Sequence, residues 1–149
     1  MHAVKYRERT LARVLSQAAR QFSAIVVTGP RQSGKTTLVR HLFGATHRYV
    51  SLDDPVTREQ AISDPRLLLS RFPAPVILDE IQYAPDLLHY LKADIDSRRT
   101  KRGLYVLTGS QTFPLMQGVS ESLAGRAAVV SLLSMSIREA VGRPDGEGT

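Results

Sequence analysis

The chain has 149 residues, 42% hydrophobic and 23% charged, as is typical of one soluble globular domain that buries about two thirds of its unfolded surface. It contains no cysteine, which excludes disulfides, thiolate metal sites and cysteine nucleophiles. Twenty Lys and Arg against 14 Asp and Glu give a net charge of +6, which favours an anionic partner: a nucleotide, a nucleic acid or an acidic protein.

The amino terminus is charged and lacks the apolar core of a signal peptide. The longest apolar runs, such as 75-PVIL-78, are far too short to span a membrane. We therefore expect a cytoplasmic protein without a membrane partner.

Apolar residues between Arg7 and Phe22 follow the spacing of one helical stripe, which predicts a leading helix within residues 1–22.

Short apolar runs then alternate with segments of helical spacing. Strands are predicted at Ala24–Thr28, His47–Leu52, Val76–Leu78, Leu104–Leu107 and Ala127–Leu133, and helices at Lys35–Phe43, after Asp54-Pro55, after Asp64-Pro65 and at Pro85–Arg98. This alternation favours parallel pairing and a three-layer α/β/α sandwich, here residues 23–141. Residues 135–141 start like a helix, and the polar, Gly-rich residues 142–149 are expected to be a disordered tail.

A phosphate-binding loop stands between the first strand and the helix after it. Residues 29-GPRQSGKT-36 fit the pattern G-x-x-x-x-G-K-[ST], in which the glycines let backbone N–H groups wrap around phosphate oxygens at a helix amino terminus. Lys35 is expected to reach the β- and γ-phosphates, and the Thr36 hydroxyl to be a ligand of Mg²⁺. The predicted nucleotide contacts are Gly29, Pro30, Arg31, Gln32, Ser33, Gly34, Lys35, Thr36 and Thr37. Arg31 either touches phosphate or is a solvated loop arginine.

A pair of acidic residues follows the buried strand in 76-VILDEIQ-82. The four apolar residues 75-PVIL-78 place Asp79 at the carboxyl end of that strand, beside the phosphate loop of a doubly wound sheet, where its carboxylate holds Mg²⁺ through the water shell. Glu80 is then positioned to polarise the attacking water. Taken alone, an Asp-Glu pair would be read as a surface turn. Its position after a phosphate loop favours the catalytic interpretation.

The strand in 104-LYVLTGSQ-111 ends on small polar residues. A polar side chain here is expected between the acidic pair and the γ-phosphate, where it reports whether that phosphate is present. Ser110 and Thr108 are both candidates, and Ser110 is slightly preferred. The alternative is an ordinary strand-ending turn rich in Gly and Ser.

With these pieces in place, the chain resembles the P-loop ATPases that have an additional central strand and a catalytic glutamate. More narrowly, it resembles a bacterial and archaeal ATPase family with an AAA-like amino-terminal domain. The segments that carry the resemblance are 28-TGPRQSGKTTL-38, 51-SLDDP-55, 76-VILDEIQYAPDLL-88, 107-LTGSQ-111 and 120-SESLAGRAAVVSLLSMSIRE-139. The resemblance implies a P-loop NTPase fold with sheet order 5-1-4-3-2. It also implies a carboxyl-terminal domain, which we expect to be missing from this chain.

Two further site residues follow from the resemblance. Arg126 matches the arginine of the family's Ser-Leu-Ala-Gly-Arg motif, which implies action on the γ-phosphate within one subunit, action on a neighbouring subunit, or a structural salt bridge. Asp53 is expected at the carboxyl end of a strand, where it supports the metal shell, while Asp54 caps a helix.

The resulting expectation is a Mg²⁺-dependent ATPase core that couples ATP binding and hydrolysis to a conformational switch. We expect it to form a homo-oligomer or to act with a partner protein. The alternative is a nucleotide-gated binding module with negligible turnover. A GTPase or a small-molecule kinase is disfavoured, because the sequence has no Asn-Lys-x-Asp guanine reader and no sign of a substrate lid. The basic segment 98-RRTKR-102 raises the possibility of DNA binding, with a solvated loop as the competing interpretation.

Overall fold

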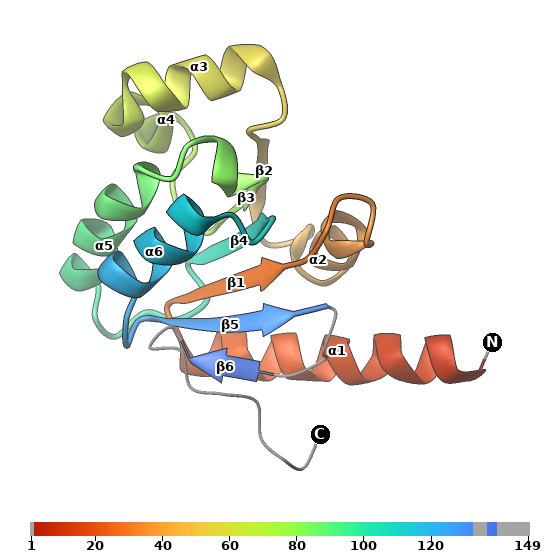
Figure 1. The fold of residues 1–149 in the computed structure, drawn as a ribbon. Helices are drawn as coiled ribbons and strands as arrows, with labels where there is room; N and C mark the ends of the chain where they lie inside the picture. Colours follow the sequence, from red (N-terminus) through yellow and green to blue (C-terminus); the bar gives the residue numbers. More distant parts are fainter. Residues whose placement is uncertain (1, 133–136, 140–149) are drawn as a thin grey trace.

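The sheet is built from five parallel strands and one antiparallel strand. The computed structural model describes residues 2–132 and 137–139, and the strand order is β2-β3-β4-β1-β5-β6 (Figure 1). The strands are β1 (Ala24–Thr28), β2 (Arg48–Ser51), β3 (Val76–Asp79), β4 (Tyr105–Gly109), β5 (Ala127–Ser131) and β6 (Ile137–Glu139). The first five strands confirm the predicted parallel order 5-1-4-3-2.

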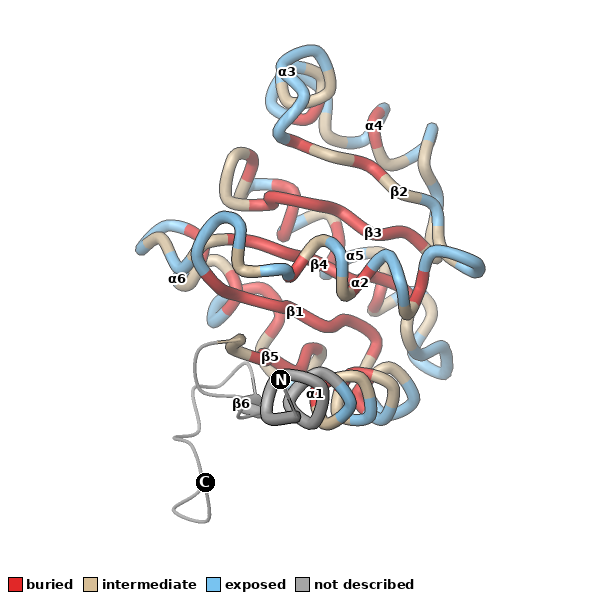
Figure 2. The backbone as a smooth tube through the Cα atoms, turned by 90° about the vertical axis from the view of Figure 1, so that its right-hand side faces the viewer, coloured by how far each residue is buried: buried red, intermediate tan, exposed pale blue. Residues whose placement is uncertain are grey.

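The central strands are short runs of β-branched and other apolar residues, and all of β1, β3 and β4 is buried (Figure 2). Successive side chains of a strand point to opposite faces of the sheet. Ala24 and Val26 therefore belong to one apolar cluster, whereas Ile25 and Val27 belong to the other. A sheet that is buried on both faces needs helices on both sides, which is the sandwich predicted from the sequence.

The helices divide between the two faces. The apolar cluster on one face contains residues of α1 (His2–Gln21) and α2 (Lys35–Phe43). The cluster on the other face contains residues of α3 (Pro55–Ser63), α4 (Pro65–Arg71), the short 3-10 helix η1 (Ile81–Tyr83), α5 (Leu87–Ser97) and α6 (Phe113–Ser122). Figure 1 shows α5 and α6 side by side on this second face.

Asp-Pro and Thr-Phe-Pro signals start three of the helices. Asp54 accepts a hydrogen bond from the Thr57 N–H at 3.0 Å, and Asp64 accepts one from the Leu67 N–H at 3.1 Å. Each is followed by proline at the first helical position, where a missing N–H costs nothing. The helix cap predicted for Asp54 is thus confirmed.

Two expectations were wrong or incomplete. Residues 137–139, which were expected to start a helix, form β6 and pair antiparallel with β5, with Ile137 opposite Val130. The helix α6 was not predicted, because Pro114 and Gly118 interrupt the apolar spacing of its sequence.

The expected disordered tail at 142–149 lies outside the described residues. Within the described residues, no helix has both the length and the apolar composition that a membrane crossing requires.

Leu107 lies in the middle of β4 and is fully buried. Replacing it with alanine removes apolar contacts from the centre of the sheet and leaves a cavity. We expect Leu107→Ala to lower the free energy of unfolding by about 2–5 kcal/mol, as measured by urea denaturation. Val56 is 65% exposed on α3, so Val56→Ala is the matched control, with an expected change within about 0.5 kcal/mol. Equal effects of the two changes would contradict the described core.

Candidate active site

The phosphate-loop motif forms a tight connection between β1 and α2, at the edge of the sheet where the parallel strands end (Figure 1). Gly34 has a φ of 89°, in the left-handed region that favours glycine. At Gly29, an added Cβ would lie 2.9 Å from the Ser33 Oγ, so a side chain at this position would displace that hydroxyl. The two glycines of the motif therefore serve different purposes: Gly34 allows the backbone conformation, and Gly29 leaves space for the Ser33 hydroxyl.

Polar groups inside this loop are buried and incompletely paired. Lys35 is 2% exposed, and its Nζ donates a hydrogen bond to the Pro30 carbonyl oxygen at 3.1 Å. The Ser33 Oγ is buried and has no hydrogen-bond partner among the described residues. Buried polar groups normally find partners, so an ammonium with one carbonyl and a hydroxyl with none fit a loop that receives an anion. The remaining predicted contacts Pro30, Arg31, Gln32, Gly34 and Thr37 are exposed at this edge.

The Asp79 carboxylate lies next to the phosphate loop and is held by three hydroxyl groups. The Thr36 Oγ1 donates to its Oδ1 at 2.7 Å, and the Thr108 Oγ1 donates to the same oxygen. The Tyr49 hydroxyl donates to Oδ2 at 2.8 Å. Asp79 is only 4% exposed, and a buried carboxylate requires such donors. The structure thus brings together Thr36 and Asp79, the two residues that the sequence predicted as magnesium ligands.

The hydrogen bond to Asp79 also affects the pKa of Tyr49. Burial, followed by the hydrogen bond to Asp79, raises the pKa of the Tyr49 phenol to about 12. The phenol therefore remains a neutral donor to Asp79 at physiological pH. Sequence analysis missed Tyr49, because its role depends on the pairing of β2 with β3, which places Tyr49 opposite Ile77.

Glu80 has a left-handed backbone conformation that is unusual for a residue with a side chain, with φ 60° and ψ 50°. Its N–H donates to the Thr108 Oγ1 at 3.0 Å, which holds this conformation in place. The Oε1 accepts from the Gln82 Nε2 at 2.9 Å, and the Oε2 lies 4.0 Å from the Lys35 Nζ. Residues in such conformations concentrate at functional sites, and Glu80 is brought to the phosphate loop as its sequence position predicted.

Thr108 is the polar side chain of β4 that reaches the acidic pair. Its single hydroxyl donates to the Asp79 carboxylate and accepts from the Glu80 N–H, so it connects both residues. Thr108 therefore occupies the position next to the acidic pair, and the slight preference for Ser110 as the residue facing the γ-phosphate stays a prediction. Ser110 lies beyond the end of β4, and its backbone N–H donates to the Gln82 Oε1 at 3.1 Å.

Gln82 is a second residue that sequence analysis missed. Its amide group accepts from the backbone of Ser110 and donates to Glu80, so it bridges the segments that follow β3 and β4. An added Cβ on Gly109 would lie 2.9 Å from the Gln82 Oε1, which shows how closely the two segments approach. The only sequence signal was its position two residues after Glu80.

An arginine pair surrounds Tyr83 at the same edge of the sheet. Arg31, in the phosphate loop, donates to the Tyr83 hydroxyl at 2.7 Å and lies 3.6 Å from the Asp53 carboxylate. Arg58, on α3, lies over the Tyr83 ring and 3.8 Å from Asp53. Asp53 therefore forms ion pairs with two arginines, and its expected support of the metal shell stays a prediction.

Arg126 lies at the opposite edge of the sheet. It directly precedes β5, and its carbonyl oxygen accepts from the N–H of Ala24, the first residue of β1. The phosphate loop begins after Thr28, about 13 Å further along that strand. The guanidinium forms two hydrogen bonds to Asp96, at 2.7 and 3.0 Å. Action of Arg126 on a phosphate in its own subunit is therefore excluded, and the structural salt bridge is observed.

A family model described as an AAA domain matches residues 21–141, which contain the phosphate loop, Asp79 and Glu80. The chain belongs to this family. Membership confirms the resemblance to AAA-type P-loop ATPases and indicates a nucleotide-binding, ATPase-like domain.

Two curated relatives of this AAA domain are each 35% identical over 133 residues. They are the uncharacterized protein Mb2031c of Mycobacterium bovis and the uncharacterized protein Rv2008c of Mycobacterium tuberculosis. The match covers 88% of this chain and 30% of each relative. The chain thus spans less than a third of the length of the curated relatives that it matches.

The Thr108 hydroxyl provides a direct test of the site's geometry. Thr108→Val keeps the shape of the side chain, but it leaves the Glu80 N–H without its acceptor and the Asp79 carboxylate without one donor. We expect the free energy of unfolding to fall by about 1–3 kcal/mol. Thr108→Ser keeps the hydroxyl and should retain most of the stability. Urea denaturation of both variants checks this, and equal losses would contradict the hydroxyl's role.

Proposed function

We propose that this AAA domain binds ATP with Mg²⁺ and hydrolyses it, and that the ATP-bound and ADP-bound states differ in conformation. The observation that carries the proposal is the hydrogen bond between Thr36 in the phosphate loop and the Asp79 carboxylate. It joins a loop suited to a polyphosphate to a pair of oxygen ligands suited to Mg²⁺, an ion that prefers hard oxygen donors.

The triphosphate would be held by the backbone N–H groups of residues 29–36, the amino terminus of α2 and the Lys35 ammonium. Ser33, whose hydroxyl has no partner among the described residues, would gain a phosphate oxygen as its acceptor. Bound Mg²⁺ would neutralise charge on the phosphate oxygens, with Thr36 and Asp79 as the residues that hold it. These contacts supply binding and orientation but do not yet activate water.

Glu80 is our proposed base. Its carboxylate would accept a proton from the attacking water as the water oxygen bonds to the γ-phosphorus and the bond to the ADP oxygen breaks. The left-handed backbone of Glu80 and its contact with Gln82 support a fixed position for this carboxylate. Gln82 also contacts the backbone at Ser110, so a change at Glu80 would be transmitted to the segment that leads into α6.

Arg31 is the arginine that we propose to act on the phosphates, in place of Arg126. It is part of the phosphate loop, and its side chain is 56% exposed, with the guanidinium anchored by Tyr83 and Asp53. A positive charge close to a transferring phosphoryl group stabilises the charge that develops on its oxygens. Because the anchors lie on the segments after β2 and β3, a shift of Arg31 toward the nucleotide would also move those segments.

A nucleotide-gated binding module with negligible turnover is the second candidate. One observation favours it: both carboxylate oxygens of Glu80 have neighbours, Gln82 on one side and Lys35 on the other. A carboxylate in this arrangement is less free to accept a proton. The two candidates differ in whether Glu80 contributes to turnover.

Two substitutions separate ATP binding from ATP hydrolysis. Lys35→Ala should weaken ATP binding roughly tenfold to a hundredfold, because it removes a hydrogen bond to a charged group. Glu80→Gln should keep the affinity while phosphate release falls by about 10²–10⁴. Calorimetric titration and steady-state phosphate release measure the two effects. Unchanged binding in Lys35→Ala would disprove the phosphate loop assignment. Equal, very slow turnover of Glu80→Gln and the parent chain would favour the binding module.

A further substitution tests the role of Arg31. Arg31→Ala should lower kcat by about 10³ or more while changing ATP affinity far less, because the charge acts on the transition state. Arg48→Ala is the matched control, since Arg48 is exposed at the first residue of β2 and donates to the Pro73 carbonyl oxygen. If Arg31→Ala and Arg48→Ala have the same kcat, Arg31 does not act on the phosphates and its contacts with Tyr83 and Asp53 are structural.

A further inference from the structure

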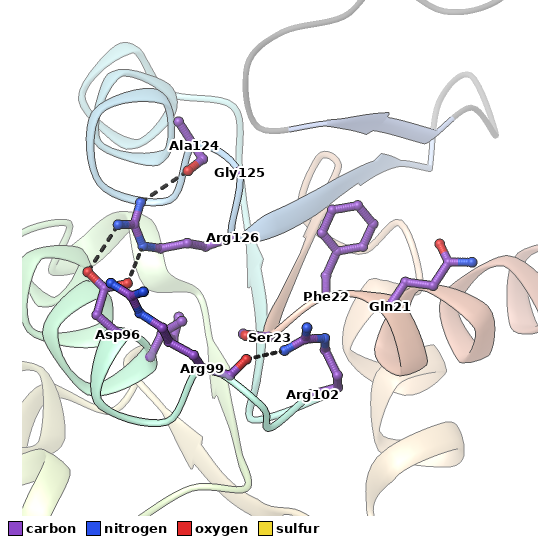
Figure 3. Close-up of a pocket in the computed structure, with 10 residues that line it drawn as sticks. Gln21, Phe22, Ser23, Asp96, Arg99, Arg102, Ala124, Gly125 and Arg126 are labelled. Atoms are coloured by element: carbon purple, nitrogen blue, oxygen red, sulfur yellow. Dashed lines mark hydrogen bonds and ion pairs between the residues drawn. The ribbon is translucent and has the colours of Figure 1, made fainter.

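A polar cleft opens where the parallel strands begin, at the edge of the sheet opposite the phosphate loop. Its volume is about 430 Å³, and it lies where α1 leads into β1, where α5 leads into β4 and where α6 leads into β5 (Figure 3). Three arginines line it together with Asp96 and Phe22: Arg99, Arg102 and Arg126. These residues come from segments far apart in the sequence, so only the fold assembles this cleft.

The charges in the cleft do not cancel. Arg126 and Asp96 neutralise each other through their paired hydrogen bonds, which also lower the pKa of the Asp96 carboxyl and keep it ionised. Arg99 and Arg102 are exposed, and the Arg102 guanidinium donates to the uncharged carbonyl oxygens of Arg99 and Lys101. Two positive charges therefore remain beyond the ion pair.

The basic loop that carries these charges is fastened to the start of β1. The Ser23 Oγ donates to the Lys101 carbonyl oxygen at 3.1 Å, and the Gly103 N–H donates to the Phe22 carbonyl oxygen at 2.9 Å. Gly103 has a φ of 63°, and an added Cβ would lie 3.1 Å from the Ala19 carbonyl oxygen. Arg99 and Arg102 are thus presented by a loop of defined shape.

We propose that this cleft is a second anion site, which binds the phosphodiester backbone of a nucleic acid. Sites for small molecules are mostly apolar and enclosed. This cleft is open and polar, and the exposed Lys101 extends its positive charge outside it. Repeated positive charge along an open surface matches a ligand with repeated negative charge, and arginine is the residue best suited to phosphate oxygens. The site is separate from the nucleotide site and does not depend on the proposed hydrolysis.

The test compares two charge-matched double variants. Arg99→Glu with Arg102→Glu reverses the two free charges of the cleft. Arg9→Glu with Arg13→Glu makes the same change in net charge on the exposed side of α1, about 12–18 Å along that helix from Gln21. Fluorescence anisotropy with a labelled 20-nucleotide single strand and a 20-base-pair duplex measures affinity at several salt concentrations, and thermal melting checks that both variants are folded.

We expect the cleft variant to lose at least about tenfold in affinity at low salt, and its salt dependence to weaken by about 0.7 per lost contact for a single strand or 0.9 for a duplex. The control variant should lose much less. Comparison of the two probes identifies which form of nucleic acid is bound. No binding of either probe by the parent chain, or equal losses in the two variants, would overturn the proposal.

Two further measurements test whether the oligonucleotide binds in the cleft and whether the cleft prefers nucleic acid to other polyanions. Lys35→Ala should bind the oligonucleotide as the parent does, and loss of binding in this variant would place the oligonucleotide in the phosphate loop and overturn the second site. Polyglutamate should displace the oligonucleotide only weakly at equal charge concentration. Equal displacement would show that the cleft recognises any polyanion, such as an acidic protein, and would overturn the assignment to nucleic acid.

Discussion

Both oxygens of the Asp79 carboxylate accept hydrogen bonds, and the three donors come from three different elements. Thr36 lies on α2, Tyr49 on β2 and Thr108 on β4. An ionised carboxylate at the end of a buried strand is costly unless it is fully hydrogen-bonded, so this arrangement follows from solvation before any ligand is considered. The Thr36 bond fastens the phosphate loop to β3, and the Tyr49 and Thr108 bonds join β3 to its two neighbouring strands. Together they define the geometry on which the proposed chemistry depends.

Different functional groups gather at the two ends of the parallel strands. Where the parallel strands end, a buried ammonium, a carboxylate pair and a glycine-rich loop lie together, as expected for the ligand side of an open α/β sheet. Where the strands begin, an arginine-lined cleft gathers the segments before β1, β4 and β5. The five residues of β1 connect Ser23, beside the cleft, to Gly29 in the phosphate loop.

Much of the fold and part of the site could be predicted from the sequence, because their causes are local. The phosphate loop needs glycine at Gly34 for its positive φ, and glycine at Gly29 for close packing against Ser33. Wholly apolar strands must be buried on both faces, which requires alternating helices and parallel pairing. Asp79 then follows from its place at the end of such a strand, and the family resemblance supplied the order of the strands.

The remaining features depended on tertiary contacts between distant segments. The choice of Thr108 over Ser110 depended on where β4 ends: the strand extends to Gly109, so Thr108 lies within it and faces β3. Strand β6 depended on pairing with β5, which no local pattern encodes. The amino acid sequence by itself determined which residues are predicted to bind a phosphate. Only the packed sheet decided which of them meet, because strand register and strand ends place Tyr49 beside Asp79 and keep Arg126 at the opposite edge.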